Sequence, residues 1–160
     1  MSMIRRSSLT PEQALQKARH FCAYQERCHS EVKEKLYSFG LYKKDVEAAL
    51  STLIEENYLN EERFAIQFAG GRFRMKQWGR VKIRYELKQK LVGEYCIKKA
   101  LAALDKEDYH KTLEKLATDK WEDLKGETDF VRRGKLKDHL LRKGFESDLI
   151  GQAIETLRDF

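Results

Sequence analysis

One apolar pattern occurs three times along this chain, and it limits the folds that the chain can adopt. The pattern has eight positions, and seven of them are apolar in every copy. Because apolar residues three or four positions apart share one face of a helix, each copy predicts a helix, a tight turn and a second helix. The copies are Val32, Leu36, Gly40, Leu41, Val46, Ala49, Leu50 and Leu53; Ile83, Leu87, Leu91, Val92, Ile97, Ala100, Leu101 and Leu104; and Leu136, Leu140, Gly144, Phe145, Ile150, Ala153, Ile154 and Leu157.

A further amphipathic helix is expected between the copies, at about residues 60–76 and about residues 106–124. The chain has one proline and nine glycines among its 160 residues, and 41% of the residues are hydrophobic. This composition favours helices over loop-rich β structure. We therefore predict an all-α protein of three tandem three-helix, helix-turn-helix-like repeats in an elongated or curved arrangement, in which each small core is stabilised by its neighbours.

The predicted boundaries follow from these helices and from local start signals. We expect a disordered lead-in at residues 1–9, a first module with an N-terminal helix at 10–76, a second module at 77–125 and a third at 126–160. Thr10 and Pro11 have the pattern of a helix start, and Ser30 and Asn60 are expected to cap later helices. Gly126 begins the expected flexible joint before the third module.

Several classes of function lack support in the sequence. There is no glycine-rich phosphate loop, HExxH motif or GxSxG motif, so neither an enzyme nor a cofactor is expected. His20, Cys22, Cys28 and His29 do not form the two compact ligand pairs of a zinc site, so no metal is expected. The odd number of cysteines, with Cys96 the third, favours a reducing cytoplasm. No apolar run predicts a membrane span, and the first residues do not resemble a secretory signal.

Positive charge is concentrated in residues 72–90, which we call the basic block. The block carries +7, whereas the whole chain carries +6, so the remainder is close to neutral. Such a concentration is typical of a surface for a polyanion or an acidic protein, although a solvated helix face has the same composition. Its eight cations are Arg72, Arg74, Lys76, Arg80, Lys82, Arg84, Lys88 and Lys90.

Within the block, Arg80, Arg84 and Lys88 recur every four residues beside the apolar stripe, so we expect them to form an exposed basic stripe. The interleaved aromatics either stack on nucleic-acid bases or pack between modules; these are Phe73, Trp78 and Tyr85. Weaker basic patches lie at Lys98–Lys99 and at residues 132–143. Acidic residues in the second helix of the first copy argue against sequence-specific reading of DNA by a helix-turn-helix.

The order and spacing of several motifs resemble the bacterial RecX regulators of the RecA recombinase over about residues 10–160. One departure is Leu91, where the family usually has glycine, so helix termination is expected to fall to Gly93. The matching segments are Ser30-x-x-x-x-x-Leu36-x-x-x-Gly40, Asn57-Tyr-Leu-Asn-Glu-Glu-Arg-Phe-Ala65, Arg72-x-x-x-x-x-Trp78-Gly-Arg80-x-Lys-Ile83, Glu86-Leu-x-x-Lys90, Leu141-Arg-Lys-Gly-Phe145 and Ile150-x-x-Ala-Ile154.

The resemblance implies a non-enzymatic, cytoplasmic regulator that acts in DNA recombination, DNA repair and the SOS response. It would bind RecA–single-stranded DNA filaments as a monomer and inhibit filament extension, ATPase, strand exchange and co-protease activity. The basic block would then contact RecA, single-stranded DNA or both. Two alternatives remain open at this point: a general DNA-binding protein that acts independently of RecA, and a helical-repeat scaffold that recognises peptides.

Overall fold

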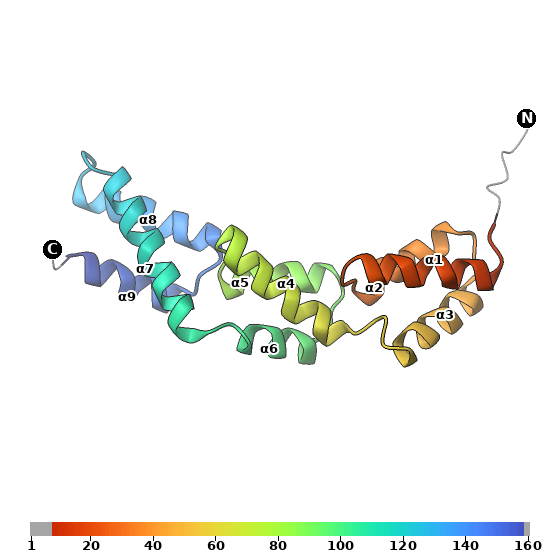
Figure 1. Ribbon diagram of the computed structural model, residues 1–160. Helices are drawn as coiled ribbons and strands as arrows, with labels where there is room; N and C mark the ends of the chain where they lie inside the picture. The colour runs from red at the N-terminus through yellow and green to blue at the C-terminus, as the bar shows by residue number, and fades with distance from the viewer. Residues whose placement is uncertain (1–7, 159–160) are drawn as a thin grey trace, which may run out of the picture.

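The computed structural model describes residues 8–158, and every regular element among them is an α-helix (Figure 1). This confirms the prediction of an all-α fold. Within the described range the helices are α1 (Pro11–Tyr24), α2 (His29–Ser38), α3 (Lys43–Glu55), α4 (Glu61–Lys76), α5 (Arg80–Gln89), α6 (Glu94–Ala102), α7 (Lys106–Asp123), α8 (Asp129–Lys143) and α9 (Ser147–Arg158). They form an elongated, curved body with α1–α3 at one end and α7–α9 at the other.

The helix starts follow local sequence signals at two of the three expected caps. Thr10 accepts a hydrogen bond from the Gln13 N–H while the Gln13 side chain accepts one from the Thr10 N–H, which completes a capping box. Asn60 accepts from the Arg63 N–H at 2.9 Å. The prediction for Ser30 was wrong, because α2 begins at His29 and its N-cap is Cys28, two residues earlier. Residues 1–7 of the predicted lead-in lie outside the described residues.

The helices pack in consecutive threes, which differs from the boundaries expected at residues 76 and 125. α4 packs mainly against α6, and α7 packs against both α8 and α9. The helix that precedes each repeated pair therefore belongs with that pair and not with the preceding one. The apolar pattern defined the faces of these helices, but it did not say which neighbouring pair each face would contact.

The buried side chains form two separate clusters. The α1–α3 core contains ten buried residues, including Val32, Leu36 and Leu53. The α4–α9 core contains 21, which run without a break through both remaining three-helix units. Cys28, at the start of α2, belongs to the second cluster although the rest of its helix packs in the first. The first unit is thus less integrated into the body than the other two are into each other.

The joint between the second and third units connects the end of α8 to the start of α5. The Gly79 N–H donates to the Lys143 carbonyl at 2.8 Å, and the Val81 N–H donates to the Gly144 carbonyl at 2.9 Å. These bonds satisfy N–H groups that a helix start leaves without intrahelical partners. A side chain at position 79 would place its Cβ 2.3 Å from the Gly144 oxygen, so only glycine permits this approach.

Tyr109 of α7 lies at the centre of the same joint. Its side chain is fully buried and its ring stacks on Phe73 and contacts Phe145, with ring centroids 5.7 and 5.2 Å away. The hydroxyl accepts the Arg80 N–H at 3.0 Å and donates to the Glu146 carboxylate. Burial, and then the bond to Glu146, raise the pKa of Tyr109 well above its ordinary value, so the hydroxyl keeps its proton as a donor.

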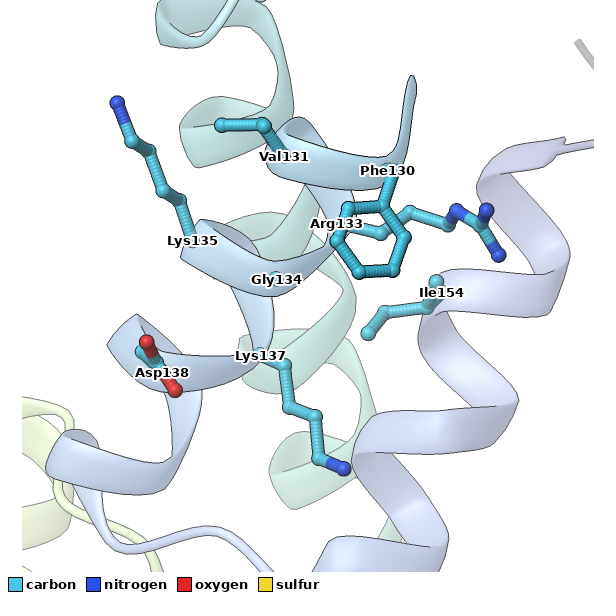
Figure 2. A pocket seen from close by; sticks show the side chains of 8 residues that line it. All are labelled: Phe130, Val131, Arg133, Gly134, Lys135, Lys137, Asp138 and Ile154. Atoms are coloured by element: carbon cyan, nitrogen blue, oxygen red, sulfur yellow. The ribbon is translucent and has the colours of Figure 1, made fainter. Parts of the chain in front are cut away.

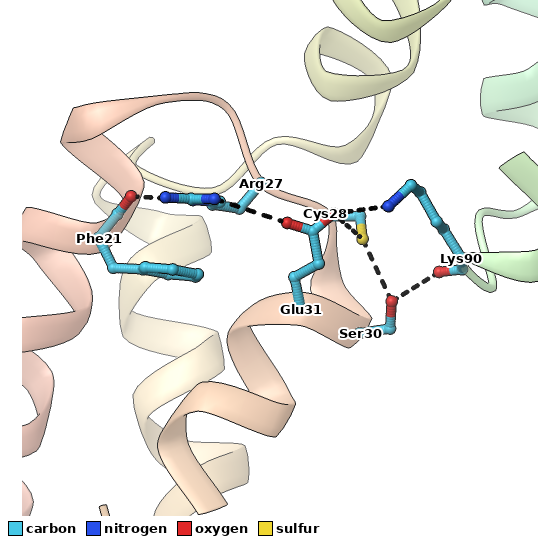
Figure 3. A network of polar contacts seen from close by, with 6 residues as sticks. All are labelled: Phe21, Arg27, Cys28, Ser30, Glu31 and Lys90. Atoms are coloured by element: carbon cyan, nitrogen blue, oxygen red, sulfur yellow. Dashed lines mark hydrogen bonds and ion pairs between the residues drawn. The ribbon is translucent and has the colours of Figure 1, made fainter. Parts of the chain in front are cut away.

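The joint between the first and second units repeats this arrangement with side chains in place of backbone. Here the end of α5 meets the start of α2, and the Ser30 hydroxyl donates to the Lys90 carbonyl at 2.7 Å (Figure 3). The Lys90 ammonium pairs with Glu31 at 3.3 Å. Cys28 stands at the repeat position of Gly79, and its Sγ lies 3.2 Å from both the Ser30 hydroxyl and the Glu31 carboxylate. Leu91 takes the left-handed conformation expected of glycine, with φ of 62°. The expectation that Gly93 would end the preceding helix was wrong, because α5 ends at Gln89 and Gly93 is the N-cap of α6.

Candidate protein and nucleic-acid interface

The basic block is divided in the structure between α4, α5 and the turn that joins them. Three of its cations are held by acids of neighbouring helices: Arg80 pairs with Glu146 at 2.7 Å, Arg84 pairs with Glu94, and Lys90 pairs with Glu31. Arg80 and Lys90 therefore act in the two joints, and the basic stripe expected along Arg80, Arg84 and Lys88 is partly neutralised. Three of the eight cations are therefore engaged within the fold, which leaves fewer free charges than the sequence count indicated.

Three more cations of the block surround aromatic rings. The Arg72 guanidinium lies 4.7 Å from the centre of the Phe68 ring, and the Lys82 ammonium lies 4.5 Å from that of Trp78. The Lys76 ammonium lies 5.5 Å from the centre of the same Trp78 ring. Trp78 is half-buried and packs against the α4–α9 core. Its position supports the packing interpretation of this aromatic residue over stacking on bases.

The remaining cations, Arg74 and Lys88, are exposed, and the structure shows neither in an ion pair among the described residues. Val81, Tyr85 and Lys88 lie four and three residues apart on α5, so they share its outer face. Val81 and Tyr85 are 54% and 61% exposed, which is more than a core-facing apolar residue would be. The outer face of α5 is thus mixed in character, apolar and basic together, as binding surfaces on proteins often are.

A groove of about 440 Å³ lies beside this face, between α5, α6 and the start of α7. Arg80, Arg84, Lys98 and Lys106 contribute its polar lining, and no acid lines it among the described residues. The hydrogen bond from Arg84 lowers the pKa of Glu94 nearby, and the charges of Lys88 and Lys98 act in the same direction. The sequence had singled out Lys98 as a weaker patch but missed Lys106, which only the packing of α7 brings here.

The third basic patch, at residues 132–143, is partly neutralised. A groove between α8 and α9 is lined by Arg133, Lys135 and Lys137, and Arg133 lies next to the exposed Phe130 (Figure 2). Arg133 pairs with Asp129 at 3.0 Å and Lys135 with Glu127 at 2.6 Å. These ion pairs leave less net charge than the sequence count indicated.

The cysteines and histidines do not form a site in the described range. In residues 8–158 no group of three or more His, Cys, Asp or Glu side chains is placed to hold a metal ion. Cys22 and Cys28 lie in different cores, and burial raises the pKa of both thiols. Raised pKa values keep these thiols protonated, which suits neither a nucleophile nor a metal ligand. None of the described helices combines the length and apolarity that crossing a membrane requires.

Tandem three-helix units that pack end to end define a helical-repeat protein. Residues 60–101 match the family model of the second three-helix domain of RecX, and residues 107–154 match that of the third. Together with the relatives below, these matches show that the chain belongs to the RecX family of regulatory proteins. They also place the second domain at α4–α6 and the third at α7–α9.

Relatives and solved structures agree with this assignment. The chain is 33% identical to the regulatory protein RecX of Prosthecochloris aestuarii over 90% of this chain and 93% of that protein. It is 31% identical to that of Thermotoga petrophila over 96% and 89% of the respective chains. The crystal structure of RecX from Lactobacillus salivarius has the same fold, with a TM-score of 0.87 at 21% identity over 94% of this chain and 97% of that one.

Proposed function

We propose that this protein binds RecA–single-stranded DNA filaments and inhibits RecA, in filament extension, ATPase, strand exchange and co-protease activity. Membership of the RecX family supports a regulatory role directed at RecA. The observation that carries the proposal is the outer face of α5, where the exposed Val81 and Tyr85 share one side of the helix with Lys88; Arg74, at the end of α4, is a further exposed cation of the basic block. A surface that is both apolar and basic suits an acidic protein partner better than it suits phosphates alone.

The shape of the protein supports the same proposal. A helical filament repeats its subunits along its length, and an elongated body with several units can contact more than one of them (Figure 1). The joint around Tyr109 fixes the second unit against the third, which keeps their outer faces in a constant relation. We infer that the protein acts as a monomer in the cytoplasm, without an enzymatic activity of its own.

Charge reversal on the outer face tests this proposal. The double variant Arg74→Glu, Lys88→Glu leaves the ion pairs of Arg80, Arg84 and Lys90 intact, so the fold should be retained. RecA ATPase on single-stranded DNA is the readout, and we expect at least about a tenfold higher concentration for half-inhibition because like charges across an interface cost more than 1.4 kcal/mol. Lys44→Glu, an exposed change on α3, is the matched control. Unchanged inhibition by the double variant would contradict the proposal.

The cationic groove of Arg80, Arg84, Lys98 and Lys106 favours the second candidate, DNA binding independent of RecA. Phosphate contacts release counterions, so binding to bare DNA should weaken steeply with salt. Binding to a RecA filament should retain a salt-resistant part from the apolar contacts of α5. Equal salt dependence with and without RecA would favour the second candidate over the first.

A further inference from the structure

A second groove, distant in sequence from the basic block, lies on the first unit between α1 and α2. It has a volume of about 500 Å³. We call it the α1–α2 groove; its lining is Lys17, His20, Phe21, Tyr24, Arg27, Lys35 and Phe39. Three of these residues are cations, three are aromatic, and none is acidic. The fold of the second and third units does not involve this groove.

Helical spacing brings these side chains together. Lys17, Phe21 and Tyr24 are four and three residues apart, which places them on one face of α1. Lys35 and Phe39 are likewise four residues apart on α2, and α1 packs directly against α2. The groove is therefore built into the packing of two helices and does not depend on a loop.

The cations are arranged over the aromatic rings. The Arg27 guanidinium lies flat over the Phe21 ring, 3.8 Å from its centre, and is fixed there by a 3.1 Å hydrogen bond to the Phe21 carbonyl (Figure 3). The Lys35 ammonium is 5.4 Å from the centre of the Phe21 ring and 5.7 Å from that of Phe39. The Lys17 ammonium is 6.0 Å from Phe39. Flat aromatic and guanidinium surfaces thus alternate with ammonium groups.

Tyr24 is the part of the groove that the fold does not use. Its side chain is 84% exposed, whereas Phe21 and Phe39 pack against the α1–α3 core. Lys17 and Lys35 are exposed beside it, and among the described residues neither is in an ion pair. Glu31 and Glu34 line an adjoining hollow that shares Phe21 and Lys35 with the groove, and Glu31 is paired with both Arg27 and Lys90.

We propose that the α1–α2 groove binds single-stranded nucleic acid, with an unpaired base stacked on Tyr24 and phosphates beside Lys17 and Lys35. Aromatic platforms with neighbouring cations bind single strands because every base has a stacking face and every nucleotide carries a charge. A duplex keeps its bases stacked on one another, so it offers only phosphates here. An acidic peptide offers charge without a base to stack. This inference does not rest on the filament proposal, since it requires neither RecA nor the basic block.

Binding of a fluorescent single-stranded oligonucleotide to the full chain, without RecA, tests the inference by anisotropy. Tyr24→Ala should weaken binding by at least about fivefold, since a stacked base contributes about 1–3 kcal/mol. Tyr24→Phe should bind as the wild type does, because the stacking face remains. Tyr42→Ala removes a tyrosine that is 83% exposed and outside the groove, and it should leave binding unchanged. Each of Lys17→Gln and Lys35→Gln should reduce the slope of log affinity against log salt by about 0.7.

Two further probes separate stacking from charge alone. An abasic strand of the same length should bind the wild type about as weakly as the normal strand binds Tyr24→Ala, and a duplex should compete poorly. Wild-type affinity in Tyr24→Ala, no binding of single strands at all, or equal competition by poly-glutamate would each overturn the inference. Loss of strand binding only in Arg74→Glu, Lys88→Glu would overturn it too, while leaving the filament proposal intact.

Discussion

Replacing Tyr109 with phenylalanine removes one oxygen atom from the joint between the second and third units. The ring remains, and with it the contacts to Phe73, Phe145 and the Arg80 guanidinium, whose central carbon lies 3.8 Å from the ring centre. The donor to Glu146 and the acceptor for the Arg80 N–H are lost. The variant therefore isolates the polar part of the joint from its apolar part.

The magnitude follows from these two bonds. A hydrogen bond to a charged group contributes about 1.5–3 kcal/mol, and leaving a partner unsatisfied adds to the cost, so we expect a loss of about 2–3 kcal/mol in the free energy of unfolding. For a chain of 160 residues this corresponds to a decrease in Tm of about 4–12 °C. Thermal and urea unfolding, followed by far-UV circular dichroism, measure both quantities.

The matched control is Tyr85→Phe on the outer face of α5. Tyr85 is 61% exposed, and removal of its hydroxyl should change stability by less than about 0.5 kcal/mol. If Tyr109→Phe is as stable as Tyr85→Phe, the two bonds at Tyr109 do not stabilise the joint, which then depends on the backbone bonds of Gly79 and Val81 and on the shared core.

Two further changes test other features of the third unit. Gly144→Ala should destabilise the protein by about 1–3 kcal/mol in urea unfolding, because φ at this position is +94° and the new Cβ would lie 2.2 Å from the Lys82 Cβ. The control is Gly151→Ala in the middle of α9, where a Cβ meets no atom within 4 Å; it should be neutral or slightly stabilising. Burial, and then the charges of nearby cations, lower the pKa of His139 in the folded protein. Because the unfolded chain therefore binds this proton more readily, the free energy of unfolding should fall as the pH drops below about 6.5, until His139 is protonated in the folded state too. His139→Gln should flatten this part of the stability curve; an unchanged curve would assign the pH dependence to other groups.

The sequence was sufficient for the repeat, the helical class and most helix starts, because these depend on local spacing. Val32, Ile83 and Leu136, the first residues of the three copies, are all fully buried, as the pattern predicts. The boundaries of the three-helix units depended on which neighbour α4 and α7 contact, and an apolar face alone does not determine its partner.

The candidate site was less predictable for the same reason. Charge counts located the basic block, but they did not show that Arg80 and Lys90 would pair with Glu146 and Glu31, which are distant in sequence. Lys106 joined the cationic groove only through the packing of α7. The α1–α2 groove combines residues that no single run of charge or aromatics marks, although the spacing of Lys17, Phe21 and Tyr24 was visible in the sequence.

The division of the buried residues into two clusters has a consequence for how the protein opens. Local unfolding proceeds in units whose stability depends on the apolar contacts that they contain, and the α1–α3 core has ten buried residues against 21 in the α4–α9 core. The first unit is tied to the second by side-chain bonds, around Ser30 and Lys90 and between Glu26 and Arg63; among the described residues no backbone bond like that of Gly79 joins these two units. Amide protons of α1–α3 should therefore exchange with solvent as one early group, while those of α4–α9 stay protected.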